Sequence, residues 1–333
     1  MKTLAYLGSI ALPPLVMVGL WVVLFHYQLG VPVERHLAKR GLRWEEKVNL
    51  VERFANRQKL VIISGSNSYI SLAAKTIERQ LKVVTVNAAL MASFGVRYYV
   101  ESLSPYLRSG DTVVLPLEYF FYDSRYAGKD YNFDTQLFVL RQDPDYYRGL
   151  SLDEKLGWLI NTHPASVAAA VAVKTGLSPP PQVTTRPKNR GWRGDVLSEF
   201  VHKPKLFNKI KPVSYRYDGQ SVQLERLAAF VTWARRNNVQ VVAAYPSHLS
   251  SATVKPPAAD MLASIEAFWR GLGVPVLGQP QNSYYKPRHV FDTAYHLTNE
   301  GRKIHTQQFI DLLCDAVSEG RVTAQNWGAS CER

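Results

Sequence analysis

Between about residues 58 and 318, short apolar runs alternate with segments of helical periodicity. The runs KLVIIS (59–64), KVVTVN (82–87), DTVVLPLEYF (111–120) and VQVVAAYP (239–246) are bounded by polar or turn residues, a pattern that predicts buried strands. The shorter run GVPVLG (273–278) predicts an edge strand, because Pro275 has no N–H group to donate to a neighbouring strand.

Helical patterns separate these runs. After the first run, Ile70, Ala73, Ile77 and Leu81 recur at helical spacing, with charged residues on the opposite face. Comparable patterns predict helices over about 92–107, 224–234, 261–269 and 298–317. Strands that alternate with helices are typical of a mainly parallel sheet covered on both faces. We therefore expect an α/β fold.

The region of about residues 122–220 interrupts this alternation, and we interpret it as an insertion. It contains a predicted helix pair over 152–160 and 165–174, followed by the Pro-rich, basic stretch SPPPQVTTRPKNRGWRG. The expected organisation is therefore an anchor (1–32), a polar neck (33–57), an α/β domain (58–318) and a C-terminal tail (319–333).

The N-terminal segment is apolar enough to suggest a membrane helix. From Thr3 to Val33 the only residue of the charged types is His26, and roughly 20 apolar residues span a bilayer. No signal-peptidase-like site follows the apolar run. We expect a single-pass anchor through residues 4–29 in the cytoplasmic membrane. By the positive-inside rule alone, the basic residues that follow the anchor would place the large domain in the cytoplasm. Long translocated domains can override this rule.

Composition narrows the partner classes. The 333 residues carry a formal net charge of +13, with 46% hydrophobic and 20% charged residues, which describes a globular chain with a possible anionic partner. No nucleic-acid-binding signature is present, so no nucleic acid is expected. The sequence has no metal-ligand spacing, and we expect neither metal nor cofactor. Cys314 and Cys331 would pair in an oxidising compartment and stay as thiols in the cytosol.

Polar residues follow the predicted strands, where ligands bind in open parallel sheets. Ser66 and Asn67 follow the first strand, Asn87 ends the second, and Glu118 and Tyr119 end the third. Asp292 and His296 lie in the loop FDTAYHL before the last helix. A serine nucleophile needs a nearby base, and a carboxylate can orient that base. Ser66, His296 and Asp292 are therefore a candidate catalytic triad.

Other roles remain open for the same positions. Ser66 and Ser68 could serve as turn or helix-cap residues, and Ser68 is a competing nucleophile. His248 is an alternative base, whereas Glu118 could be a buried, hydrogen-bonded carboxylate. Asn87 could donate to an oxyanion or only to the backbone. Arg97 could bind an acyl or sugar anion or form an ion pair.

Together these blocks resemble the SGNH/GDSL hydrolase superfamily. SGS (64–66) resembles the block after the first strand, VVTVNAALMASFG the second-strand block, and FDTAYHL the acid-base block. The resemblance implies a flavodoxin-like, three-layer, doubly wound sheet, with Ser66 as nucleophile and Asp292 and His296 as acid and base. It also implies that the loop near Ala92 supplies an oxyanion-hole amide. Glu118 and Tyr119 stand where the family has Gly-x-Asn-Asp.

With these differences from the family pattern, the sequence is more similar to the membrane-anchored branch of the superfamily. That branch includes the alginate O-acetylation and teichoic-acid D-alanylation factors. That resemblance implies an extracytoplasmic or periplasmic acyltransferase or esterase acting on a cell-surface polysaccharide, which could be anionic. A multi-spanning membrane acyltransferase is the implied partner. The alternative is a non-catalytic partner of such an acyltransferase or of polysaccharide export machinery.

Overall fold

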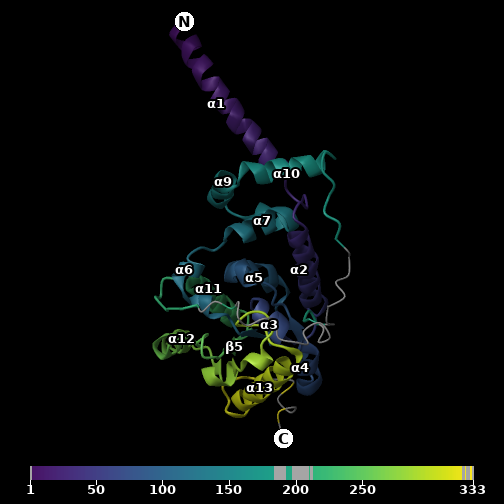
Figure 1. The fold of residues 1–333 in the computed structure, drawn as a ribbon, viewed down its shortest axis with the longest axis vertical. Coiled ribbons are helices and arrows are strands. Elements are labelled where there is room, and N and C mark those ends of the chain that lie inside the picture. The colour runs from purple at the N-terminus through teal and green to yellow at the C-terminus, as the bar shows by residue number, and fades with distance from the viewer. Residues whose placement is uncertain are drawn as a thin grey trace. The chain divides into compact units, whose positions relative to one another are not determined.

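The computed structural model describes residues 2–183, 193–196, 210, 213–324, 327 and 331, with side chains from residue 13 onward. The basic segment of residues 186–211 lies almost wholly outside this range. Figure 1 shows the helices and strands of the chain. The chain divides into two compact units. We call Met1–Leu42 with Phe133–Thr185 the helical unit, and Arg43–Asn132 with Arg186–Arg333 the sheet unit.

The sheet unit is built on five parallel strands in the order β2-β1-β3-β4-β6. Strands β1, β2 and β3 are buried along their whole length, because their apolar side chains are covered on both faces. The prediction of an α/β fold with a mainly parallel sheet is confirmed. The strands are β1 (Lys59–Ile62), β2 (Val84–Asn87), β3 (Thr112–Leu115), β4 (Gln240–Ala244) and β6 (Val276–Leu277).

Helices of the sheet unit pack in groups around these strands. Helix α13 (Asn299–Ser318) packs against α3 (Ser66–Ser71) and α4 (Ala74–Leu81). Helix α11 (Val222–Arg236) packs against α5 (Gly95–Leu103) and β4. Helix α12 (Ala259–Gly271) lies against β6.

Several predicted elements are shorter or interrupted. The third predicted strand ends at Leu115, because Pro116 cannot donate to a ladder, and Tyr119–Tyr122 forms the short 3-10 helix η3. The prediction of a single helix after the first strand is wrong, since the extended Leu72 and the non-helical Ala73 separate α3 from α4. The helix predicted over 92–107 consists instead of η1 (Ala92–Phe94), α5 and η2 (Ser104–Tyr106).

Short elements that the sequence did not predict complete the sheet unit. β5 and β7 form a separate parallel pair that lies outside the main sheet. Helix α6 follows η3, whereas η6 and η7 flank β7. Their bounds are β5 (His248–Leu249), β7 (Tyr284–Tyr285), α6 (Ser124–Ala127), η6 (Pro280–Ser283) and η7 (Pro287–His289).

Three described residues near the C-terminus, Val322, Trp327 and Cys331, contact the core of the sheet unit. Cys314 on α13 forms a disulfide with Cys331, at a Cα–Cα distance of 5.1 Å. Val322 and Trp327 are buried in the same apolar cluster as Cys314. The two cysteines, whose pairing the sequence left open, are therefore joined.

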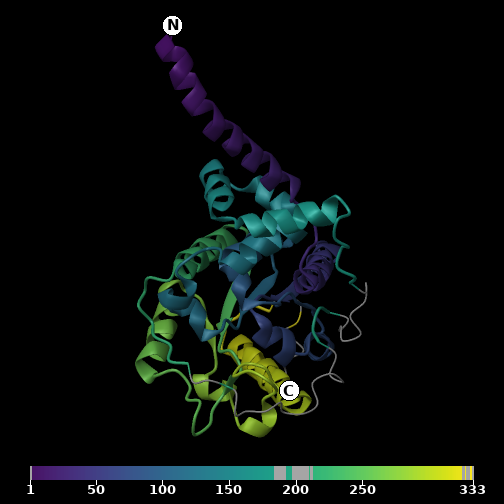
Figure 2. The same cartoon turned by 45° about the horizontal axis from the view of Figure 1, so that its top comes forward.

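The helical unit contains α1, the first residues of α2, and α7 to α10 (Figure 2). Its predicted helix pair corresponds to α9 and α10, whereas α7 and α8 were not predicted. The buried Arg141 of α7 donates to Gln28 Oε1 at 3.0 Å and to Ser166 Oγ at 2.9 Å, which ties three segments together. The helices are α1 (Lys2–Tyr27), α2 (Arg35–Arg53), α7 (Phe133–Gln142), α8 (Pro144–Gly149), α9 (Leu152–Asn161) and α10 (Pro164–Lys174).

Within the part of the chain whose side chains are described, no single helix has both the length and the apolar character needed to cross a bilayer. The described apolar stretch of α1 is Pro13–Tyr27, and α9 with α10 passes the same criterion only as a pair bent by 91°.

Candidate active site

Ser66, His296 and Asp292 form a continuous hydrogen-bonded line, although 230 positions separate the serine from the histidine. Ser66 Oγ lies 2.9 Å from His296 Nε2, and His296 Nδ1 lies 2.6 Å from Asp292 Oδ1. The ionised carboxylate can only accept, so Nδ1 carries a proton and Nε2 of the neutral ring accepts from the serine hydroxyl. His296 is 12% exposed and Asp292 35%, so the line runs from a partly covered serine toward solvent.

Glu118 stabilises the loop that carries Ser66. This carboxylate accepts the N–H groups of Gly65 at 3.1 Å and of Asn67 at 3.2 Å, the two residues on either side of Ser66. Its side chain is buried, and that burial raises the pKa of Glu118 above its usual range. Glu118 therefore fixes the backbone of the loop and does not reach the triad.

Ser64 and Asn67 close the same loop onto the end of β3. Asn67 Nδ2 donates to Pro116 O at 2.8 Å, and Ser64 Oγ lies 2.6 Å from Asn67 Oδ1. The Ser68 hydroxyl donates to the same Asn67 oxygen at 2.8 Å. Ser68 thus faces Asn67 and not the histidine, which leaves Ser66 as the serine paired with a base. The N-terminal cap of α3 is Gly65, so the cap role considered for the serines is wrong.

Gly65 packs so tightly that no side chain fits. A Cβ atom placed there would lie 2.5 Å from Ala92 Cβ and 2.7 Å from Ala92 Cα, and it would also meet Glu118 Oε1. Ala92, predicted near the oxyanion site, is therefore adjacent to the serine loop. Among the described residues, neither the Ser66 nor the Ala92 N–H donates a hydrogen bond to the protein.

The backbone around His296 is positioned by Ser71, the last residue of α3. The Ser71 hydroxyl accepts from Leu297 N at 3.1 Å and donates to Tyr295 O at 3.1 Å, so it bonds both neighbours of the histidine. Ser247 Oγ donates to the same Tyr295 oxygen at 2.7 Å. The sequence analysis missed both serines, because only the fold brings them to this loop.

Asn87 does not face the triad. Its Nδ2 atom donates to Ser68 O at 2.7 Å and Leu72 O at 3.4 Å, so backbone carbonyls occupy its donor group. The expectation that its side chain holds an oxyanion is corrected by this geometry: Asn87 connects the end of β2 to α3. A second buried side chain supports that strand end, since Lys47 Nζ donates to Asn87 O at 2.8 Å and to Gly194 O at 2.5 Å. Burial lowers the pKa of Lys47 to about 7.

The remaining predicted site residues also bond elsewhere. Arg97 pairs with Glu101 at 2.8 Å and with Asp130 at 3.3 Å, so the ion-paired alternative holds and its assignment as a ligand for an acyl or sugar anion is corrected. Tyr119 is buried and its backbone N–H donates to Tyr295 OH at 3.3 Å. His248 is buried against Tyr295 with its Nδ1 near Leu249 O, and burial lowers its pKa to about 4. The base in contact with Ser66 is His296, so the alternative assignment of His248 is corrected.

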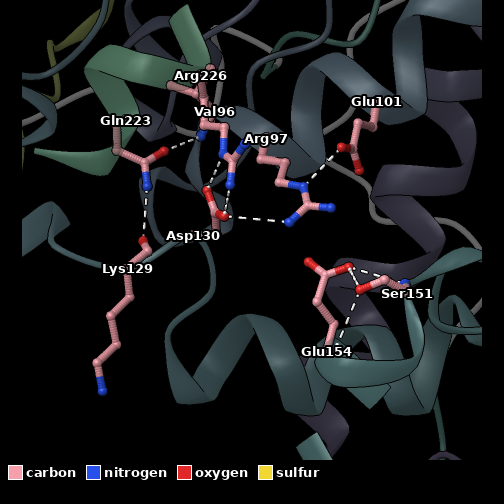
Figure 3. A network of polar contacts seen from close by, with 9 residues as sticks. All are labelled: Val96, Arg97, Glu101, Lys129, Asp130, Ser151, Glu154, Gln223 and Arg226. Carbon is pink, nitrogen blue, oxygen red and sulfur yellow. Dashed lines mark hydrogen bonds and ion pairs between the residues drawn. The ribbon is translucent and has the colours of Figure 1, made fainter. Parts of the chain in front are cut away.

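A cavity of about 300 Å³ borders Ala92 and hence the serine loop. Three of its lining residues, Lys129, Asp130 and Gln223, belong to the polar network of Figure 3. In this network Gln223 accepts from Val96 N at 2.6 Å and donates to Lys129 O at 2.8 Å, and Arg226 pairs with Asp130. Aromatic, hydroxyl and charged side chains are mixed in its wall, which includes Phe120, Phe121, Tyr126, Ser93, Ser124, Arg125 and Lys129. A larger cavity of about 540 Å³, between α12, β6 and α13, contains none of the triad residues.

Within the described ranges, no three His, Cys, Asp or Glu side chains are grouped as metal ligands. No family model matches the chain, and no curated protein sequence matches it at a significant level. The chemistry of the site therefore follows from its geometry, namely a serine hydroxyl beside an oriented histidine.

Proposed function

We propose that this chain is an SGNH-like serine acyltransferase or esterase that adds or removes acyl groups on a cell-surface polysaccharide. The observation that carries the proposal is the Ser66–His296–Asp292 line, with distances of 2.9 and 2.6 Å. The strand order β2-β1-β3-β4-β6 is that of flavodoxin-like sheets, and the serine loop follows β1, at the point where the order reverses.

In the proposed reaction, Ser66 Oγ attacks the acyl carbonyl carbon while its proton passes to His296 Nε2. Asp292 stabilises the imidazolium that forms. The N–H groups of Ser66 and Ala92 hold the oxyanion, because backbone donors near the nucleophile are suited to that charge. His296 then returns the proton to the leaving group, and an acyl-serine remains. A sugar hydroxyl or water, deprotonated by His296, attacks this ester, and His296 returns the proton to Ser66 Oγ as the C–O bond to the serine breaks.

Two further features support a polysaccharide substrate outside the cytoplasm. The cavity beside Ala92 offers the aromatic faces of Phe120 and Tyr126 for a sugar ring, and Arg125 and Lys129 for anionic groups. The disulfide between Cys314 and Cys331 suits an oxidising compartment. We propose α1 as the membrane anchor, because its described side chains from Leu15 to Leu20 include large apolar groups exposed on the protein.

A fluorophosphonate probe tests the acyl-serine step. The full chain should be labelled, and Ser66→Ala should abolish labelling. Ser68→Ala is the matched control, because Ser68 lies two residues away on the same helix and bonds Asn67 instead of the histidine. His296→Ala should also reduce labelling to the background. Equal labelling of folded wild-type and Ser66→Ala proteins would exclude Ser66 as the nucleophile.

One observation favours a second candidate, a non-catalytic partner of a membrane acyltransferase. The amides on both sides of Ser66 already donate to Glu118, so neither is available to an oxyanion. In that case Ser66→Ala and His296→Ala would leave polysaccharide acylation in cells unchanged, whereas removal of residues 1–30 would abolish it. Loss of acylation in the two point variants would reject the non-catalytic role.

A further inference from the structure

We propose that α9 of the helical unit is a second membrane contact, lying in the headgroup region of a phospholipid bilayer beside the point where α1 enters it. This inference rests on the proposed anchoring by α1, and it assigns a lipid-binding surface to a segment outside that anchor. It concerns the helical unit alone.

The first observation is an apolar stripe on the outer face of α9. Leu152, Leu156 and Ile160 recur every fourth residue and are 73%, 48% and 77% exposed. Trp158 is buried on the opposite face of the same helix. An apolar helix face that is exposed on the protein can be buried at the headgroup boundary of a membrane, with the helix lying in the plane of the interface.

The second observation is that α9 is held against α1. Trp21 Nε1 of α1 donates to Leu159 O of α9 at 3.1 Å. The buried Phe25 packs edge-on against Tyr147, which in turn contacts Trp158, with ring centroids 5.7 and 5.8 Å apart. Both views in Figures 1 and 2 show α10 crossing the lower end of α1, and the two helices are in contact. The stripe therefore has a fixed position relative to α1.

The position of Trp21 sets the depth of α9. Trp21 follows the exposed apolar side chains of Leu15, Met17 and Leu20 on α1. Because tryptophan is enriched at the boundary between hydrocarbon and headgroups, we place Trp21 at that boundary. Because Trp21 bonds Leu159, the exposed side chains at 156 and 160 lie at the same boundary.

Phospholipid is the occupant that fits these observations. The stripe is aliphatic, and the helix that carries it is hydrogen-bonded to α1, whose exposed apolar side chains would lie in the same bilayer. Leu177, just beyond the end of α10, adds a further large apolar side chain that is 84% exposed. A protein partner would need a complementary surface at the same membrane depth. The test below distinguishes such a partner from lipid.

The test uses the full chain in vesicles of phosphatidylcholine and phosphatidylglycerol. Single cysteines replace Ile160 (stripe), Met17 (anchor) or Ala229, an exposed position on α11 of the sheet unit, and carry an environment-sensitive fluorophore. The disulfide keeps Cys314 and Cys331 from reacting under non-reducing conditions. We expect lipids spin-labelled near the headgroup to quench the Ile160→Cys label at least about twofold more than the Ala229→Cys label. Lipids labelled on the upper acyl chain should quench the Met17→Cys label, because four residues, or about 6 Å of helix, separate Met17 from Trp21.

Each outcome has one meaning. Quenching at position 17 with none above the control at position 160 would overturn the α9 contact and leave the anchor intact. Quenching at 160 alone would overturn the anchor and, with it, the proposed place of α9 beside α1. No quenching at either position would overturn both. If the Ile160→Cys label is shielded from iodide in native membranes but not quenched in pure lipid vesicles, a protein covers the stripe and the lipid contact is overturned.

Discussion

Replacing Gly65 by alanine should separate the serine from its base. The new methyl would lie 2.5 Å from Ala92 Cβ, about 0.9 Å closer than the 3.4 Å at which ordinary contact begins, and the nearest atoms include backbone. The loop must therefore move by several tenths of an ångström to about 1 Å. Ser66 Oγ starts 2.9 Å from His296 Nε2, so such a shift lengthens or breaks the bond. A misplacement of about 1 Å costs about 100-fold in rate, and overpacking costs about 1–3 kcal/mol of stability.

The assay is the rate of fluorophosphonate labelling, measured with thermal unfolding of the same samples. Gly157→Ala is the matched control, because no atom lies within 4 Å of the Cβ position in this helical glycine. The control should label at the wild-type rate and be slightly more stable, by about 0.5–1 kcal/mol. A Gly65→Ala protein that folds and labels as fast as the control would refute the link between loop packing and serine alignment.

Three further changes test other parts of the sheet unit. Ser71→Ala removes the bonds to Tyr295 and Leu297, and should lower stability by about 1–3 kcal/mol and labelling about tenfold. Unchanged labelling would show that other contacts position the histidine. Lys47 has a folded pKa of about 7, below its ordinary 10.5, so the unfolded chain binds more protons between these values. The free energy of unfolding, relative to Lys47→Met, should therefore rise by about 1.4 kcal/mol per pH unit from pH 7 to 10; a flat difference would contradict the buried, neutral amine. Cys314→Ser opens a loop of sequence separation 17 and should cost about 3 kcal/mol in thermal unfolding. Reductant should destabilise the wild type equally and leave the variant unchanged.

The strands of the main sheet were predictable because buried parallel strands require continuous apolar runs. KLVIIS and KVVTVN therefore mark β1 and β2 within two residues of their ends. The helices were harder to bound. The break at Leu72 depends on tertiary contacts, since Ala73 N donates to Thr306 Oγ1 and Ser71 bonds the histidine loop. Such partners lie more than 200 positions away, and no local pattern reveals them.

The candidate site was also predictable only in part from the sequence. By itself, the sequence determined the residue types and their place after the strands: Ser66 after β1, and His296 and Asp292 before α13. Only the tertiary structure decided that Ser66 rather than Ser68 meets the histidine, because Asn67 engages the Ser68 hydroxyl. The tertiary structure also decided that the Asn87 side chain donates to backbone carbonyls and that Glu118 accepts from the amides on both sides of Ser66. The physical reason is that periodicity fixes which residues reach a strand end, whereas the direction of each polar side chain depends on the donors and acceptors that distant segments bring to it.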